Sequence, residues 1–123
     1  MAEIYPKRLD EQEIHKKGWG HEVWIENIIE YCGKLLHFKA GKSSSMHYHV
    51  KKLETMYLAR GHMKISLIEP ESGKMYERFL LPGDSIQIPR GQAHQLIALE
   101  DCDLFEFSTR HEDSDSYRVW KGD

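Results

Sequence analysis

Residues 41–61 read GKSSSMHYHVKKLETMYLARG and place two histidines two residues apart, followed by a glutamate. Side chains two apart on a β-strand share one face, so His47 and His49 point the same way and Tyr48 points the other. At about 3.3 Å of rise per residue, the two imidazoles can converge on one ion. A turn then leads into an antiparallel strand that begins at Glu54 and returns a carboxylate to them. This stretch predicts a β-structure that carries most of a metal site.

A second stretch, GDSIQIPRGQAH at residues 83–94, supplies the remaining ligand. Pro89 and Gly91 favour a sharp turn, and His94 begins the strand beyond it. Three imidazoles and one carboxylate suit a divalent transition ion such as Mn, Fe, Co, Ni or Zn, whereas calcium prefers oxygen ligands alone. Four protein ligands leave one or two positions for a small-molecule substrate. We therefore predict a metal site formed by His47, His49, Glu54 and His94.

The rest of the chain has the pattern of an all-β domain. Helical periodicity is nearly absent, and short runs of β-branched and aromatic residues alternate with turn residues. The expected strands are residues 21–27, 31–40, 44–50, 54–61, 62–69, 75–81, 84–89, 93–100 and 103–109. Turns are expected at residues 70–73 and 81–84, where proline precedes glycine. This spacing favours a sandwich or barrel over βαβ units.

A length of 123 residues fits one domain. Residues 1–17 are expected to be a tail or a short helix, because Leu9 and Ile14 are too few for an apolar helix face. Residues 18–123 then form the single folded domain. The apolar side chains at 117–120 are expected to pack back on the domain or on a partner subunit. Since small barrels often pair their exposed edge strands, we expect a homodimer.

Composition excludes several classes of partner. The net charge is −3 and the basic residues are scattered among acids, so a nucleic-acid partner is not expected. There is no run of about 18 apolar residues, so a membrane partner is not expected either, and we predict a soluble cytoplasmic protein. Cys32 and Cys102 are far apart in the sequence and are expected to be buried free thiols.

The two histidine-bearing stretches fit G-x5-H-x-H-x4-E-x6-G and G-x5-P-x-G-x2-H, and so resemble the two cupin motifs. The resemblance implies a double-stranded β-helix, or jelly-roll barrel. One departure is Ala98, where cupins often carry asparagine. Within the cupins, KGWGHEVW (17–24), IPRGQAHQL (88–96) and DSYRV (115–119) resemble the small domain of type II phosphomannose isomerases.

This likeness implies a metal-dependent sugar or sugar-phosphate isomerase, similar to mannose-6-phosphate isomerase, that interconverts aldose and ketose through an enediolate. Such a reaction needs a base, for which Glu106 in LFEFS is the candidate. Alternation against Phe105 and Phe107 leaves Glu106 either on the solvent face or inside the barrel. A substrate phosphate would need a cation near the barrel mouth, with candidates Lys42, Arg78 and Arg90.

Two other functions fit the same motifs. One is an Fe(II)-dependent cupin dioxygenase with the same ligands, and the other is a non-catalytic sugar-binding cupin. The remaining histidines are expected on the surface or in turns, namely His15, His21, His62 and His111. His37 is ambiguous, because either it or its neighbours Leu36 and Phe38 point inward.

Overall fold

The computed structural model describes residues 2–123 and is built almost entirely from β-strands. The strands are β1 (Glu13–Lys17), β2 (Gly20–Asn27), β3 (Cys32–Phe38), β4 (Met46–Tyr48), β5 (Glu54–Arg60), β6 (Met63–Ile68), β7 (Met75–Leu80), β8 (Ser85–Ile88), β9 (His94–Ala98), β10 (Cys102–Ser108) and β11 (Tyr117–Trp120). Two short 3-10 helices accompany them, η1 (Leu9–Glu11) and η2 (Asp113–Asp115).

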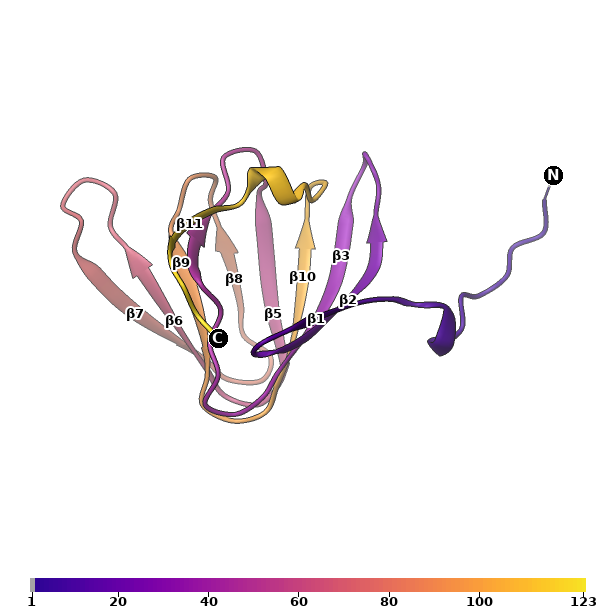
Figure 1. Cartoon of the computed structure of the whole chain (residues 1–123), viewed down its shortest axis with the longest axis horizontal. Helices are drawn as coiled ribbons and strands as arrows, with labels where there is room; N and C mark the ends of the chain where they lie inside the picture. The colour runs from indigo at the N-terminus through magenta and orange to yellow at the C-terminus, as the bar shows by residue number, and fades with distance from the viewer. Residues whose placement is uncertain (1) are drawn as a thin grey trace.

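The strands form two antiparallel sheets that face each other (Figure 1). The six-stranded sheet has the order β1-β2-β3-β10-β5-β8, and the five-stranded sheet has the order β11-β4-β9-β6-β7. Neighbours such as β3 and β10 are distant in sequence, as expected when a chain winds between two sheets. The all-β jelly-roll predicted from the sequence is confirmed.

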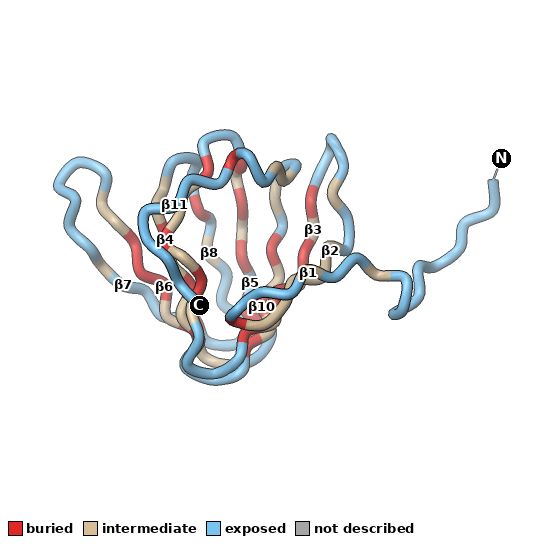
Figure 2. The backbone as a smooth tube through the Cα atoms, viewed as in Figure 1, coloured by how far each residue is buried: buried red, intermediate tan, exposed pale blue. Residues whose placement is uncertain are grey.

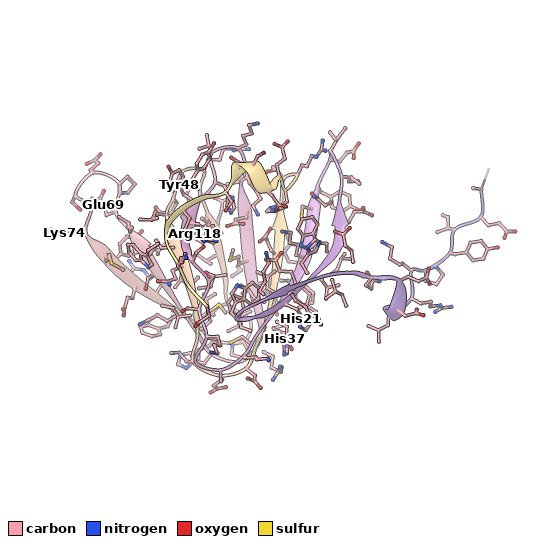
Figure 3. The ribbon with its side chains drawn as sticks, in the orientation of Figure 1. His21, His37, Tyr48, Glu69, Lys74 and Arg118 are labelled. Carbon is pink, nitrogen blue, oxygen red and sulfur yellow. The ribbon has the colours of Figure 1, made fainter. Side chains whose placement is uncertain are left out.

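Each of the nine strands expected from the sequence is present, with ends that differ by a few residues. The expected hairpin turn lies between β6 and β7, where Glu69 and Lys74 mark its two sides (Figure 3). The expectation of a tail or short helix over residues 1–17 holds for the short helix η1, but it needs correction over residues 13–17, which form β1 and pair with β2. This strand lies at a sheet edge and is largely exposed, so it lacks the alternating apolar pattern that marks a buried strand.

The interior is divided into an apolar end and a charged end by the strand register. Along β3 and β10, Phe38 pairs with Cys102 and Leu36 with Leu104, and all four side chains are buried. At the other end of the same pair, buried Lys34 lies opposite buried Glu106. Figure 2 shows the buried residues along the facing surfaces of the sheets. The barrel therefore holds an apolar core at one end and buried charges at the other.

Trp19 belongs to the apolar end, and both cysteines are buried as expected from the sequence. Trp19 is buried and stacks on Phe38, with ring centroids 3.8 Å apart. Cys32 and Cys102 are both buried free thiols. No helix among residues 2–123 is long and apolar enough to cross a membrane.

All four motif glycines have positive φ angles, and two of them, Gly61 and Gly83, have very different surroundings. Gly61 has φ of 100° and Gly83 has φ of 97°, in the region that disfavours a side chain. A Cβ atom at Gly61 would overlap the carbonyl oxygen of Asp101 and the sulfur of Cys102, whereas a Cβ at Gly83 would have nothing within 4 Å. Gly61 thus has a steric requirement in addition to the backbone one.

We predict that Gly61→Ala lowers the free energy of unfolding by at least about 3 kcal/mol, because both the overlap and the backbone strain apply. Gly83→Ala should cost only about 1–2 kcal/mol, from backbone strain alone. Urea unfolding of the two variants beside the unaltered protein measures the difference. Equal losses would show that the close approach at Gly61 is relieved without cost.

Candidate functional site

Three histidines meet at the charged end of the barrel. His47 lies in β4 and pairs in register with His94 at the start of β9, while His49 follows the end of β4. Their ligand nitrogens all lie within 4.8 Å of one another. His94 is fully buried and His49 nearly so. The expected convergence of the three imidazoles is present, and its spacing suits one divalent ion.

The three rings are held in the same tautomer by the backbone. Each Nδ1 lies 2.9 Å from a carbonyl oxygen: Ser45 for His47, Asp115 for His49 and Gln92 for His94. A carbonyl only accepts hydrogen bonds, so each Nδ1 must carry the hydrogen and donate it. Each Nε2 is then left with the lone pair that a metal ion needs, and the three rings are oriented in advance.

Glu54 contacts this cluster at its buried side. Its Oε1 lies 3.0 Å from Nε2 of His94, but without the alignment of a hydrogen bond. Both carboxylate oxygens of Glu54 and Nε2 of His94 are buried without an aligned hydrogen bond, although Oε2 of Glu54 lies 3.3 Å from the ammonium group of Lys52. Such atoms are costly unless something satisfies them, and a cation between the imidazoles and the carboxylate would do so. The side chains present therefore fit a metal ion.

A buried lysine joins Glu54 to the candidate base Glu106. Lys52 donates a hydrogen bond from Nζ to Oε2 of Glu106 at 3.0 Å and lies 3.3 Å from Oε2 of Glu54. It also contacts Nδ1 of His111 at 3.1 Å. Glu106 is buried inside the barrel, so the inward alternative for this residue holds and Phe107 is the residue that faces outward.

A role for Lys52 was not predicted from the sequence, because this residue lies in the turn expected before the strand that begins at Glu54. Lys52 is two residues before Glu54, so the same period of two that places side chains on one strand face also places these two together. That spacing was the available signal. His111 was expected on the surface or in a turn, and it does lie in the loop after β10, but its side chain lines the cavity beside Lys52. It follows the end of β10, where no periodicity indicates which way a side chain points.

His37 faces outward beside His21, with stacked rings (Figure 3).

These contacts set the protonation of the site. Burial lowers the pKa of His47 to about 3, and the nearby His94 adds to this, so His47 is neutral at pH 7. Burial works to raise the pKa of Glu54, but His94 and Lys52 outweigh it and hold the pKa far below its ordinary value. Burial and the charge of Glu54 raise the pKa of Glu106, against the opposing effect of Lys52. The two carboxyl groups thus differ: Glu54 stays ionised, and Glu106 binds a proton more readily.

The pKa of His94 follows from its contact with Glu54. Burial acts to lower this pKa, but the Glu54 carboxylate favours the protonated ring and raises it. A proton and a metal ion at Nε2 satisfy the same carboxylate, so the two compete. Metal binding at this site should therefore release a proton when His94 is charged.

The site opens into a cavity of about 350 Å³. Its walls include Trp19, Met56 and Leu96 on the apolar side. His47, His49, His111, Lys52 and Glu106 form the polar side, while His94 is buried behind the lining residues. Cationic side chains at the rim are Lys17, Arg118 (Figure 3) and Lys121. The candidates named earlier for a phosphate, Lys42, Arg78 and Arg90, do not line this cavity. Arg78 instead lies over the ring of Tyr76, and Arg90 donates a hydrogen bond to the carbonyl of Lys51.

Asp115 fixes the loop that carries Lys52. Its buried carboxylate accepts hydrogen bonds from the backbone amides of Val50, Lys51 and Lys52, at 3.0 to 3.1 Å. Its own carbonyl accepts the hydrogen bond from His49. One residue near the C-terminus therefore orients a predicted ligand and the loop beside it. The next strand, β11, pairs with β4, so residues 117–120 return to the domain as expected. Their apolar side chains do not become buried there, because Tyr117, Val119 and Trp120 remain exposed.

Comparison with known proteins matches this geometry to a family. A family model described as a cupin domain matches residues 34–107. The chain belongs to the cupin family. The match covers both motif stretches, including His47, His49, Glu54 and His94. No curated protein sequence matches this cupin.

Solved structures with the same fold come from larger proteins. The capsular polysaccharide assembling protein CapF from Staphylococcus aureus has a TM-score of 0.78 and 15% identity, and the match covers 89% of this cupin and 34% of CapF. Oxalate decarboxylase from Bacillus subtilis has a TM-score of 0.79 and 16% identity, covering 89% of this chain and 30% of that one. A further structure of that decarboxylase concerns its Mn(II) centres, with a TM-score of 0.78, 16% identity and coverage of 89% and 31%. This cupin thus spans about a third of the length of these proteins.

We predict that Lys52→Met destabilises the protein by about 3–5 kcal/mol, because it leaves two buried carboxyl groups without their shared cation. Lys51→Met is the matched control, since that neighbouring lysine is exposed and should contribute less than about 1 kcal/mol. Chemical unfolding monitored by tryptophan fluorescence measures both variants. A Lys52→Met protein as stable as the control would contradict the assignment of Lys52 as the main countercharge.

Proposed function

We propose that this cupin is a metal-dependent sugar isomerase, similar to mannose-6-phosphate isomerase, that interconverts an aldose and a ketose. The observation that supports this most is the position of Glu106. A buried carboxyl group with a raised pKa lines the same cavity as His47 and His49, whose ligand nitrogens lie within 4.8 Å of that of His94. An aldose–ketose isomerase needs both an electrophile and a base next to one substrate, and this cavity offers both.

In this proposal His47, His49, His94 and Glu54 hold a divalent ion. When bound, the ion supplies Lewis-acid stabilisation of the negative charge that develops on the substrate oxygens. The backbone carbonyls of Ser45, Gln92 and Asp115 hold the hydrogen at Nδ1, so Nε2 is the ligand atom of each imidazole, and they keep the rings correctly turned. Rigid orientation of this kind reduces the reorganisation needed during reaction.

Glu106 moves the proton between the two adjacent carbon atoms of the substrate. Its Oε2 accepts the hydrogen bond from Lys52, so Oε1 is the oxygen left to take and return the proton. The raised pKa brings this carboxyl group nearer to neutral pH, where a base can both accept and release a proton. Lys52 keeps Glu106 in place, and its ammonium group also contacts Nδ1 of His111.

The cavity favours a small, polar substrate that carries negative charge. Its acidic and basic groups offer many hydrogen-bond partners for sugar hydroxyls. Among the cations that line the cavity, Lys34 already forms an ion pair with Glu22. Lys17, Arg118 and Lys121 lie at the rim, suitably placed for an anionic end such as a phosphate. A sugar phosphate matches this distribution better than a neutral sugar does.

Metal dependence can be tested by elemental analysis followed by reloading with Mn, Fe, Co, Ni or Zn. Manganese is the first ion to test, because the decarboxylase of the same fold has Mn(II) centres. We expect the ion to raise the melting temperature, with about 2.7 kcal/mol of stabilisation at 100 times its dissociation constant. Conversion of mannose 6-phosphate to fructose 6-phosphate should appear with the ion and disappear in His49→Ala.

His62→Ala is the control for this experiment, because His62 lies outside the cavity. Both the ion and the activity should survive this change. Oxygen consumption that requires iron would contradict the isomerase and support a cupin dioxygenase. Tight sugar binding without turnover, whichever ion is loaded, would support a binding protein instead.

The proposed base is tested by Glu106→Gln, which keeps the size of the side chain. We expect kcat to fall by about 10²–10⁴, since proton transfer is lost, while metal content stays the same. Exchange of the substrate C2 hydrogen with deuterated solvent should fall by the same factor. An unchanged kcat would exclude Glu106 as the base and leave the metal site unaffected.

A further inference from the structure

A row of polar side chains crosses the outer face of the six-stranded sheet, outside the barrel cavity. His21 of β2 lies directly opposite His37 of β3, His37 lies opposite Asp103 of β10, and Asp103 lies opposite Arg60 of β5. Side chains alternate along a strand and Phe38 is fully buried, so its neighbour His37 and the rest of the row face outward. We call these four residues the outer row, and Figure 3 labels its two histidines.

The ring of His37 is held in one orientation by the carboxylate of Asp103. Nδ1 of His37 lies 2.5 Å from Oδ1 of Asp103, and the other carboxylate oxygen accepts a hydrogen bond from Nε of Arg60 at 2.7 Å. A carboxylate only accepts hydrogen bonds, so in the neutral ring Nδ1 carries the hydrogen and Nε2 keeps the lone pair. A carboxylate placed behind the ring in this way is the usual support of a histidine that binds a metal ion, because it fixes the tautomer and raises the basicity of Nε2.

His21 supplies a second imidazole beside this nitrogen. The rings of His21 and His37 are stacked, with centroids 5.2 Å apart and an angle of 27° between their planes. Residues directly opposite each other on antiparallel strands have Cβ atoms about 5 Å apart. Two nitrogens bound to one tetrahedral zinc ion, at about 2.1 Å each, lie roughly 3.4 Å from each other. Small rotations about the side-chain bonds therefore bring both rings onto one ion.

Gly20 sets how closely the two strands approach at this point. A Cβ atom at Gly20 would overlap the carbonyl oxygen of His37, so glycine lets β2 begin this close to β3. Pairing between the two strands is regular from Gly20 to Trp24, and the register shifts only after Trp24. The two imidazoles are thus carried on paired strands, which hold ligand positions more precisely than loops do.

We propose that His21 and His37 bind a divalent transition ion such as zinc or copper on the outside of the barrel, with Asp103 as the carboxylate that orients His37. Imidazole nitrogens favour these ions, whereas calcium and magnesium prefer oxygen ligands. The side chains of His37 and Asp103 are 32% and 28% exposed, so an ion can enter and water can complete its coordination. This site is separate from the barrel cavity and does not depend on the proposed isomerase function.

The outer site is expected to bind its ion more weakly than the barrel site does. It offers two imidazoles, whereas the barrel site offers three imidazoles and a carboxylate. Positive charge also lies at both ends of the row, because Lys16 of β1 is opposite His21 and Arg60 is opposite Asp103. A titration should therefore fill the two sites in sequence, the outer one last.

Equilibrium dialysis against zinc, followed by elemental analysis, tests the outer site. We expect the unaltered protein to bind one ion at each site. His21→Ala and His37→Ala should each lose the weaker ion, and His49→Ala should retain it, with unchanged circular dichroism in every case. His62→Ala is the matched control, because His62 is a half-buried histidine of neither site, and it should bind as much zinc as the unaltered protein.

The role of Asp103 is tested by Asp103→Asn, which keeps the size of the side chain and removes its charge. We expect the affinity for the weaker zinc ion to fall by about 10–100-fold, as is usual when the carboxylate behind a metal-binding histidine is lost. Glu77→Gln is the control, because Glu77 is an acid of the other sheet that pairs with Lys64 on the surface. Zinc affinity should not change in this control.

Two results would overturn the outer site. If His21→Ala and His37→Ala bind as much zinc as His62→Ala, any second ion lies elsewhere on the chain. If His49→Ala abolishes all zinc binding, the barrel holds the only site for this ion. Should either alanine variant fail to fold, His21→Gln replaces it, because it keeps a polar side chain at the half-buried position. Loss of the weaker ion is again the expected result, and its retention would overturn the proposal.

Discussion

The ammonium group of Lys52, buried between Glu54 and Glu106, constrains the whole charged end of the barrel. A buried ion costs several kcal/mol to desolvate, and that cost is offset only when its partners are held at contact distance. The partners here come from β5 and β10, which are adjacent strands, and the lysine comes from the loop before β5. Register between these strands is therefore an electrostatic requirement as well as one of hydrogen bonding. The apolar end, with Phe38 and Leu104, supplies the stabilisation that supports this charged end.

The same arrangement explains how two carboxyl groups in one cavity take different protonation states. Glu54 meets both His94 and Lys52, so it remains an anion in spite of its burial. Glu106 meets Lys52 and also the negative charge of Glu54, so its pKa rises. One carboxylate is thereby suited to a metal ion and the other to a proton. Position relative to a single lysine separates the two roles.

The sequence predicted well those features that recur with a short period. Alternation predicted the strands, and the spacing of His47, His49, Glu54 and His94 predicted the cluster, because residues on one strand face have fixed relative positions. Features that depend on partners distant in sequence were not predictable in this way. β1 is an exposed edge strand, His111 lies beyond a strand end, and the choice between Glu106 and Phe107 as the inward residue depends on the buried partners Lys52 and Lys34. Alternation gives two faces but does not say which is inside.

The double role of Asp115 affects when the site becomes complete during folding. Its carbonyl orients His49, and its carboxylate holds the backbone of residues 50–52, so a nascent chain shorter than 115 residues lacks both restraints. The barrel strands end at β10, well before this point in the chain, apart from β11. Most of the barrel can therefore assemble while His49 is still free to turn. His49 is fully oriented toward an ion only after residue 115 has docked on the loop of residues 50–52.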